Sequence, residues 1–391
     1  MYIKRIAEIR LTEILKGKKI GIILGARQVG KTTLVQHALA GRKATFLNFD
    51  VEIDKQRFIA ASVLPPLDAV RSLGTPEILV IDEAQRYPDT ARIIKGWYDT
   101  NTPMKILLLG SSSLNILSQS AESLTGRNEK LPLPPCVFEE ALRSQSWYSD
   151  AYTSDILCKQ FPQPLRIFLL DCLAYGLYPE VVTIPEKQTL LRNLSADYLW
   201  KDILQTGLIK TPDLIKRLLM LLAHQVGAEV SVNELATQLH IARPTVERYL
   251  ELLENAFVIF RLPSFSTNPR KEIAKSNKIY FWDTGIRNAL LNAFSTEEYR
   301  PDIGALWENW VVAEFAKHNL LEGNQSMLYF WRSRAQSEVD LVIKTGDRLQ
   351  AFEIKWKSKP CPTRAFNAMY GVEVATIDSS NPFAKNFAFF S

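Results

Sequence analysis

The segment GARQVGKT, from Gly25 to Thr32, constrains this chain more than any other because it fits the pattern GxxxxGK[ST]. It directly follows the apolar run IGIIL at residues 20–24, which predicts a buried strand, and a helix is predicted to follow over residues 32–40. The two glycines permit a tight turn whose backbone N–H groups can approach an anion closely. The start of the next helix adds about half a unit of positive charge. The pattern therefore predicts a loop that binds phosphate.

Two side chains in this loop have expected roles. Lys31 is expected to neutralise charge on the β- and γ-phosphates, and the Thr32 hydroxyl to ligate Mg²⁺. The predicted cofactors are therefore ATP and Mg²⁺. The residues expected to contact the nucleotide are Gly25, Ala26, Arg27, Gln28, Val29, Gly30, Lys31, Thr32 and Thr33.

A second motif, ILVIDEAQ, lies about fifty residues downstream and ends an apolar run in two acidic residues. Asp82, at the end of the predicted strand, is expected to help hold the Mg²⁺. Glu83 is placed to polarise a water molecule for in-line attack on the γ-phosphate. An adjacent Asp-Glu pair favours a water-activating ATPase over a small-molecule kinase, although a plain acidic pair at a strand end is the alternative.

Two further candidates for the reaction follow. Ser111 comes after the apolar run KILLLG and could orient the attacking water, or it could belong to a simple serine-rich turn. Arg127 precedes a weaker fifth run and could reach the γ-phosphate of its own or a neighbouring subunit, where an arginine is worth roughly 10³–10⁵ in rate. A role in a neighbouring subunit would require a homo-oligomer. The alternative is an ordinary surface arginine.

Near-continuous apolar runs separated by helical patterns predict an α/β, doubly wound parallel sheet at the start of the chain, with ligands at the carboxyl ends of its strands. Helical patterns rich in aromatic residues follow, and the chain ends in an α+β pattern of a helix and a strand meander. We expect three domains, an α/β phosphate-binding domain at residues 1–135, a helical and winged-helix region at 136–265 and an α+β domain at 266–391.

The composition disfavours several classes of protein but does not identify a function. The net charge of +5 permits nucleic-acid binding without arguing for it. The four cysteines form no CxxC pair, which disfavours a zinc site or a disulfide framework. No signal peptide is evident, and no apolar run approaches the roughly 20 residues that a membrane-spanning helix needs. We expect a cytoplasmic protein without a membrane partner.

Residues 229–262 have the outline of a winged helix-turn-helix. Its second helix is predicted over residues 243–254, where Arg243, Thr245 and Arg248 could meet DNA. Three glutamates share that helix and would be repelled by a DNA groove. DNA contact and a structural or lid role therefore both stay open.

The sequence EVDLVIKTGDRLQAFEIKW predicts a hairpin near the end of the chain. Residues two apart on a strand face the same side, so Glu353 and Lys355 project together, and the hairpin can bring Asp340 beside Glu353. Two carboxylates suit a Mg²⁺ site, and the lysine could orient a water molecule. Glu308, on the preceding helix, could add a third carboxylate. Charges that alternate on an ordinary solvated sheet are the alternative.

The segments GARQVGKTTL, VIDEAQRYPD, LLLGSSS and LTGRNEKLPLPP resemble the ATPase domain of prokaryotic ATP-binding proteins of the AAA superfamily. That resemblance implies a strand order of 5-1-4-3-2, ATP hydrolysis and a C-terminal domain of unknown function that is restriction-endonuclease-like. The Asp…Glu-x-Lys pattern is likewise similar to the active site of restriction endonucleases of the PD-(D/E)xK type.

Two functions are consistent with these observations. In the first, a Mg²⁺-dependent ATPase acts as a nucleotide switch on DNA through a nuclease-like C-terminal domain. In the second, the ATPase controls a protein-interaction module whose nuclease-like domain is not catalytic.

Overall fold

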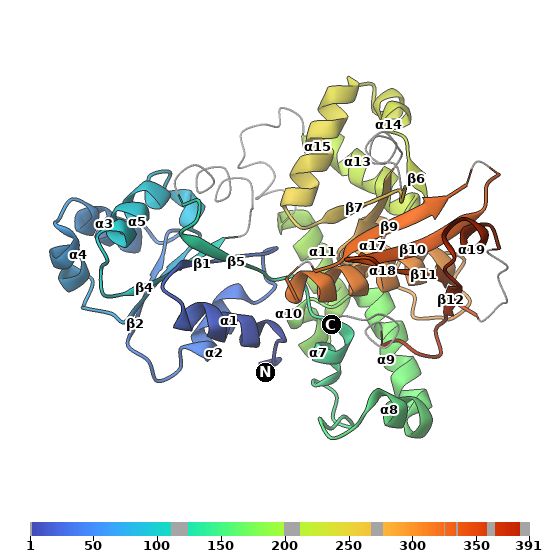
Figure 1. The fold of residues 1–391 in the computed structure, drawn as a ribbon, viewed down its shortest axis with the longest axis horizontal. Coiled ribbons are helices and arrows are strands. Elements are labelled where there is room, and N and C mark those ends of the chain that lie inside the picture. Colours follow the sequence, from blue (N-terminus) through green and yellow to red (C-terminus); the bar gives the residue numbers. More distant parts are fainter. Residues whose placement is uncertain are drawn as a thin grey trace. The chain divides into compact units, whose positions relative to one another are not determined.

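The computed structural model describes residues 2–110, 124–198, 212–266, 277–323, 325–333, 335–357 and 364–383 (Figure 1). It divides into two compact units, Tyr2–Pro134 and Pro135–Ser391. Ser111 lies outside the described residues, so its predicted role is not addressed by the structure.

The first unit is built on a five-stranded parallel sheet with the order β2-β3-β4-β1-β5. Read from the other edge, this is the order 5-1-4-3-2 that the resemblance implied, which confirms that expectation. The strands are β1 (Ile20–Leu24), β2 (Ala44–Asn48), β3 (Ile78–Asp82), β4 (Lys105–Gly110) and β5 (Asn128–Pro132). The helical elements are α1 (Ala7–Lys16), α2 (Lys31–Ala38), α3 (Glu52–Ser62), α4 (Pro66–Ser72), the 3₁₀ turn η1 (Ala84–Arg86) and α5 (Thr90–Asp99).

The inner strands are apolar along their whole length because helices cover both faces of the sheet. In Figure 1, α1 and α2 lie on one side and α3 and α5 on the other. All five residues of β1 are buried. Because the strands are parallel, their carboxyl ends meet at one edge, and this edge brings the end of β1 near the end of β3.

The first part of the second unit is mainly helical, as its sequence predicts. Its helices are α7 (Phe138–Leu142), α8 (Ser154–Gln160), α9 (Pro162–Tyr175), α10 (Pro179–Thr183), α11 (Lys187–Asn193), η2 (Leu194–Tyr198), α13 (Pro212–His224), α14 (Val232–Leu239), α15 (Arg243–Asn255) and α17 (Thr284–Leu291).

A small antiparallel sheet accompanies α14 and α15, in the order β6-β8-β7. Its strands are β6 (Glu229–Val230), β7 (Ile259–Pro263) and β8 (Asn277–Phe281). The boundary expected between residues 265 and 266 falls inside this sheet, since β7 and β8 pair along their full length. This sheet therefore joins the two regions that the sequence separated.

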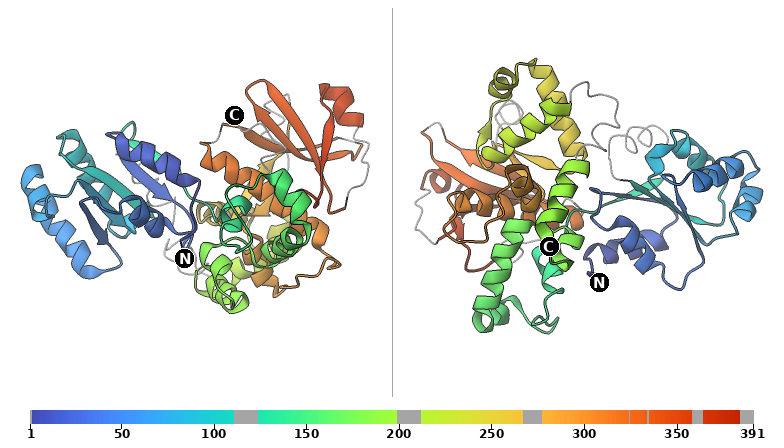
Figure 2. Two further views of the ribbon diagram at one scale, coloured as in Figure 1. Left: turned by 90° about the horizontal axis from the view of Figure 1, so that it is seen from below. Right: turned by 180° about the vertical axis from the view of Figure 1, so that it is seen from behind.

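The chain ends in a four-stranded sheet with the order β12-β11-β10-β9. Its strands are β9 (Met327–Arg332), β10 (Glu338–Thr345), β11 (Arg348–Ile354) and β12 (Val374–Ile377). Two helices accompany the sheet, α18 (Ile303–Leu321) and α19 (Arg364–Tyr370). Successive strand residues face opposite sides. Phe352 stacks on Phe315 of α18, whereas Ala351 packs in a cluster with Phe366 of α19. The two helices therefore cover opposite faces (Figure 2).

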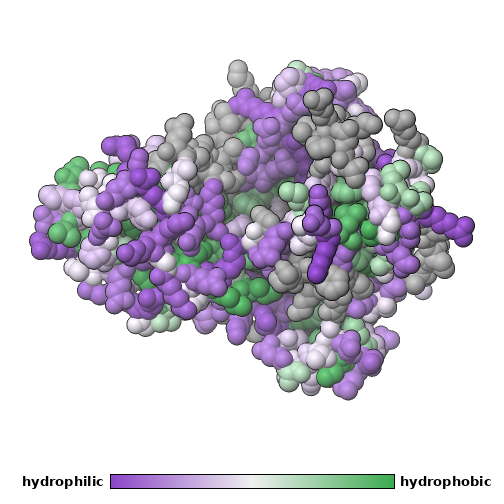
Figure 3. Space-filling model, in the orientation of Figure 1, coloured by the Kyte–Doolittle hydropathy of each residue, from purple (hydrophilic) through white to green (hydrophobic). Residues whose placement is uncertain are grey.

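Within the described part of the chain, none of the helices has the length and apolar character needed to cross a bilayer. The face drawn in Figure 3 is mostly hydrophilic, with hydrophobic residues in small separate groups.

Candidate functional site

The predicted phosphate-binding loop joins β1 to α2, and two glycines are required by its geometry. A Cβ atom on Gly25 would lie 2.1 Å from the carbonyl oxygen of Leu133, so only glycine fits there. Gly30 has a φ of +88° at the start of α2, a left-handed conformation that glycine adopts without strain. Arg5, which sequence reasoning missed, donates to the carbonyl oxygens of Val29 at 2.8 Å and Pro134 at 2.7 Å. This buried arginine holds the loop against the end of the sheet.

Lys31 is buried within the loop. Its Nζ atom donates to the carbonyl oxygens of Gly25 at 2.9 Å and Ala26 at 2.8 Å. The loop thus holds an ammonium group beside the backbone N–H groups at the start of α2. A phosphate anion could accept hydrogen bonds from both kinds of donor.

Thr32 and Asp82, which are fifty positions apart in sequence, are in direct contact. The Thr32 hydroxyl donates to Asp82 Oδ2 at 2.6 Å, and Asp82 Oδ1 accepts the backbone N–H of Glu83 at 2.9 Å. Both carboxylate oxygens of Asp82 are therefore oriented. A hydroxyl and a carboxylate at this distance offer oxygen ligands that suit Mg²⁺, so these residues fit the metal that the sequence predicts.

Glu83 follows β3 in a left-handed conformation, with a φ of 51° and a ψ of 42°. Such backbone is uncommon for a residue with a side chain and concentrates at functional sites. Glu83 Oε2 accepts a hydrogen bond from Gln85 Nε2 at 2.5 Å. Gln85, the last residue of the IDEAQ motif, was not singled out from the sequence, and the structure places it where it orients the glutamate.

Arg127 lies at the amino-terminal ends of the strands, whereas the loop lies at their carboxyl ends. It directly precedes β5, and its carbonyl oxygen accepts the N–H of Ile20, the first residue of β1. The loop begins only after the five residues of β1, roughly 16 Å away. The Arg127 side chain instead pairs with Asp99 at 2.6 Å. The suggestion that Arg127 reaches the γ-phosphate of its own subunit is therefore wrong, and only the role in a neighbouring subunit stays a prediction.

In the second unit, the hairpin brings Asp340 and Glu353 together as the sequence predicts. Lys355 Nζ lies 3.3 Å from Asp340 Oδ2 and 2.6 Å from Glu353 Oε1, and the N–H of Ile354 donates to Asp340 Oδ2 at 2.8 Å. The pairing of β10 with β9 shifts register between Val339 and Val342, so Asp340 lies within a bulge. Bulges re-aim side chains and are frequent near functional sites.

Glu308 of α18 joins the same cluster, but through a lysine that sequence reasoning missed. Lys278 Nζ lies 3.0 Å from Glu308 Oε1, 2.5 Å from Glu338 Oε1 and 3.8 Å from Asp340 Oδ1. Tyr280 also donates to Glu308 Oε1, at 2.7 Å. Lys278 and Tyr280 are two apart on β8, as are Glu338 and Asp340 on β10, and this spacing is the signal that could have revealed them. We call Lys278, Glu308, Glu338, Asp340, Glu353 and Lys355 the carboxylate cluster.

For both Lys278 and Glu308, burial and the neighbouring opposite charge shift the pKa in opposite directions. Burial alone would lower the pKa of Lys278, but Glu308, Asp340 and Glu338 outweigh that effect and raise it, so the ammonium form persists. Burial raises the pKa of Glu308 above its ordinary value, with Lys278 opposing that rise.

Lysine nitrogens lie beside the carboxylates of Asp340 and Glu353, which are expected to hold Mg²⁺. Each of these carboxylates already has an ammonium group within 3.3 Å, and Glu308 has another at 3.0 Å. The donor chemistry suits a metal, and two lysine side chains offset part of the charge of the four carboxylates. The metal-ligand role of Asp340 and Glu353 stays a prediction.

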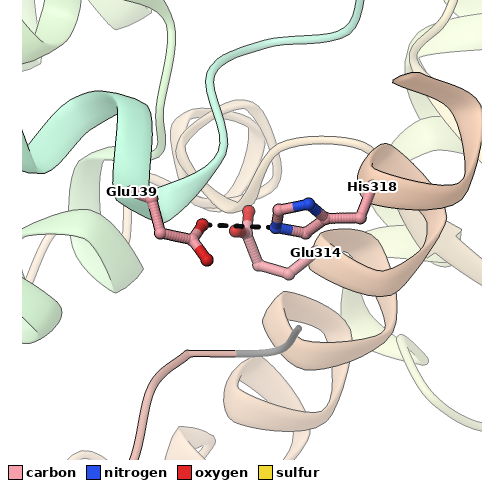
Figure 4. A group of neighbouring side chains, drawn as sticks. All are labelled: Glu139, Glu314 and His318. Carbon is pink, nitrogen blue, oxygen red and sulfur yellow. Dashed lines mark hydrogen bonds and ion pairs between the residues drawn. The ribbon is translucent and has the colours of Figure 1, made fainter. Parts of the chain in front are cut away.

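A second buried group, not predicted from the sequence, links α7 to α18 (Figure 4). His318 Nε2 lies 3.2 Å from Glu139 Oε2, and Glu314 pairs with Lys317 at 3.0 Å. Glu314 also accepts the N–H of Phe138, the first residue of α7, at 2.8 Å. Burial alone would lower the pKa of His318, but the Glu139 carboxylate outweighs it and the pKa is raised. Each carboxylate of this group therefore has a nitrogen partner.

The predicted helix-turn-helix residues lie on α15. Arg243 is exposed and pairs with Glu247 at 3.0 Å, and Arg248 is also exposed. Thr245 is half-buried. The turn between α14 and α15 passes through His240 with a φ of 55°. The surface thus mixes both signs of charge rather than forming a basic face.

Comparison with known proteins identifies three regions. An AAA domain matches residues 17–142, a domain of unknown function (DUF8612) matches 168–297, and another (DUF4143) matches 303–381. The Walker-type ATPase PABY2304 of Pyrococcus abyssi is 15% identical and aligns over 73% of this chain and 94% of its own, with a TM-score of 0.48.

Two relatives extend over most of the sequence. The uncharacterized protein Rv2008c of Mycobacterium tuberculosis is 30% identical over 382 residues, which cover 96% of this chain and 79% of that protein. The uncharacterized protein MJ1544 of Methanocaldococcus jannaschii is 27% identical over 335 residues, covering 83% and 72% of the two chains. This chain therefore belongs to the same family as Rv2008c, and its first unit is an AAA-type P-loop ATPase domain.

Proposed function

We propose that this protein binds ATP with Mg²⁺ at the loop of residues 25–33 and hydrolyses it, acting as a nucleotide-dependent switch. The observation that carries the proposal is the 2.6 Å contact between the Thr32 hydroxyl and Asp82 Oδ2. This contact joins the two motifs on which Mg²⁺-dependent phosphoryl transfer depends.

Each residue of the site has its own role in binding or hydrolysis. Lys31 and the N–H groups at the start of α2 bind the phosphate oxygens and offset their charge. Thr32 and Asp82 would hold Mg²⁺, which supplies further neutralisation of the phosphate charge. Glu83 is placed one residue beyond Asp82 to accept a proton from the attacking water, and Gln85 orients it.

Nucleotide binding tests the first part of this proposal. Lys31→Ala should weaken the binding of a fluorescent ATP analogue by roughly 10–100-fold, because a charge-assisted hydrogen bond contributes about 1.5–3 kcal/mol. Lys18→Ala, at an exposed position just before β1, is the matched control and should bind as the wild type does. Equal affinity in the Lys31 and Lys18 variants would refute the assignment.

The part of the chain that the switch controls is proposed to be the C-terminal sheet with its carboxylate cluster. One version couples the ATPase to DNA through a nuclease-like domain, and the proximity of Glu308, Asp340, Glu353 and Lys355 supports it. The other version is an ATPase-controlled protein-interaction module without catalysis. We favour the second because an ammonium group already lies beside each carboxylate that would hold the metal.

Plasmid nicking by the full-length chain separates these versions. The nuclease version expects Mg²⁺-dependent nicking that is lost in Asp340→Ala and in Lys355→Ala. The interaction version expects no nicking with ATP, with ADP or without nucleotide. Binding of a DNA duplex that weakens in Arg248→Ala would support the remaining suggestion that α15 contacts DNA.

A further inference from the structure

The position of Lys278 is unusual for a lysine, because its side chain is only 2% exposed. Lysine is seldom buried this completely unless its charge is paired. An ammonium group has three protons to donate. Here three carboxylates surround it, from Glu308 on α18 and from Glu338 and Asp340 on β10.

The strand that carries Lys278 is fixed in place. Asn309 of α18 accepts the N–H of Phe281 at 2.8 Å and donates to the carbonyl oxygen of the same residue at 3.0 Å. Tyr280, two residues after Lys278, binds Glu308 at 2.7 Å. Both contacts lie just after Lys278 and tie β8 to α18, so they fix the backbone that carries Lys278 beside Glu308.

Every carboxylate in the cluster lies beside a cationic side chain of the protein. Its four carboxylates face the ammonium groups of Lys278 and Lys355. The Arg332 guanidinium lies 3.8 Å from Glu338 but pairs more closely, at 2.7 Å, with Glu229 outside the cluster. Each carboxylate has a cationic nitrogen within 3.3 Å. A divalent metal needs several oxygen ligands, and an ammonium group seated among those oxygens competes with the metal for them.

We propose that Lys278 is the resident cation of the carboxylate cluster, that its ammonium group takes the place a divalent metal would need, and that removing it creates a divalent-cation site. The donor oxygens of Glu308, Glu338 and Asp340 converge on the Nζ position. Without the ammonium group, these hard oxygen ligands would suit Mg²⁺ or Mn²⁺. The inference does not depend on ATP hydrolysis and concerns the second unit alone.

Manganese binding tests this inference directly. Free Mn²⁺ is measured by electron paramagnetic resonance during titration of the full-length chain without nucleotide. The variants are the wild type, Lys278→Met, Lys278→Arg, Asp340→Asn and the double variant Lys278→Met/Asp340→Asn. All of them keep Thr32 and Asp82, so any binding at the ATP loop is common to the set.

We expect Lys278→Met to bind one more Mn²⁺ per chain than the wild type, and Mg²⁺ to compete for it. Lys278→Arg, which retains the charge, should gain none, and the double variant should lose most of the gain. The absence of extra binding in folded Lys278→Met would overturn the inference. If that variant does not fold, wild type and Asp340→Asn still decide the matter, because the inference requires equal Mn²⁺ binding in both. Loss of a wild-type Mn²⁺ ion in Asp340→Asn would show a metal where we place the lysine.

Discussion

Replacing Lys278 by methionine should destabilise the second unit by about 3–5 kcal/mol, the usual cost of removing one partner from a buried ion pair. The side chain is 2% exposed, and two carboxylates lie within 3.0 Å of its Nζ atom, so little solvent is available to compensate them. For a unit of this size, each kcal/mol shifts the melting temperature by about 2–4 °C. The expected decrease is therefore roughly 6–20 °C.

Thermal unfolding followed by circular dichroism, without divalent cations, measures this decrease. Lys344→Met is the matched control, because Lys344 is exposed on β10, and it should change stability by no more than about 0.5 kcal/mol. In a Glu338→Met background, Lys278→Met should cost less than it does alone, because one of its carboxylate partners is already gone. Equal, small effects of Lys278→Met and Lys344→Met would refute the reasoning.

Three further predictions concern other parts of the chain. Gly25→Ala should abolish ATP binding measured by calorimetry, because its Cβ would lie 2.1 Å from the Leu133 carbonyl oxygen; retained affinity would contradict the loop geometry. Since the pKa of His318 is raised above the ordinary histidine value of 6.5, its pair with Glu139 stabilises fully below that value and progressively less as pH rises through the higher folded pKa. Urea unfolding across that range should show this loss, and Glu139→Gln should flatten it. Arg127→Ala should leave ATP turnover unchanged at concentrations where the chain is monomeric, and a fall in that rate would contradict its position at the far edge of the sheet.

The sequence was a good guide to the first unit because its strands are locally encoded. Ile20–Leu24 and Lys105–Gly110 have the predicted limits, since apolar runs between polar or glycine residues mark strands buried on both faces. The contact between Thr32 and Asp82 follows from two parallel strands ending at one edge. The same rule could have excluded a contact between Arg127 and the γ-phosphate of its own subunit. A residue that precedes a parallel strand lies at the amino-terminal ends of the strands, away from the loop.

The second unit was less predictable because its buried groups meet over long sequence separations. His318 and Glu139 are 179 positions apart, and Lys278 meets Asp340 from a different sheet. Periodicity places each residue on a face but does not say which faces meet. The short elements α19 and β12 carry too little pattern to be recognised. The predicted hairpin was correct because Asp340 and Glu353 belong to adjacent strands joined by a short turn.

ATP turnover by Glu83→Gln tests the central claim most directly. The amide cannot accept a proton from water, so hydrolysis should fall by about 10²–10⁴-fold while ATP binding is retained. The measurement combines the rate of phosphate release with the amount of ATP that stays bound to the purified chain in Mg²⁺. The account predicts bound, unhydrolysed ATP. Hydrolysis at the wild-type rate would contradict the assignment of Glu83.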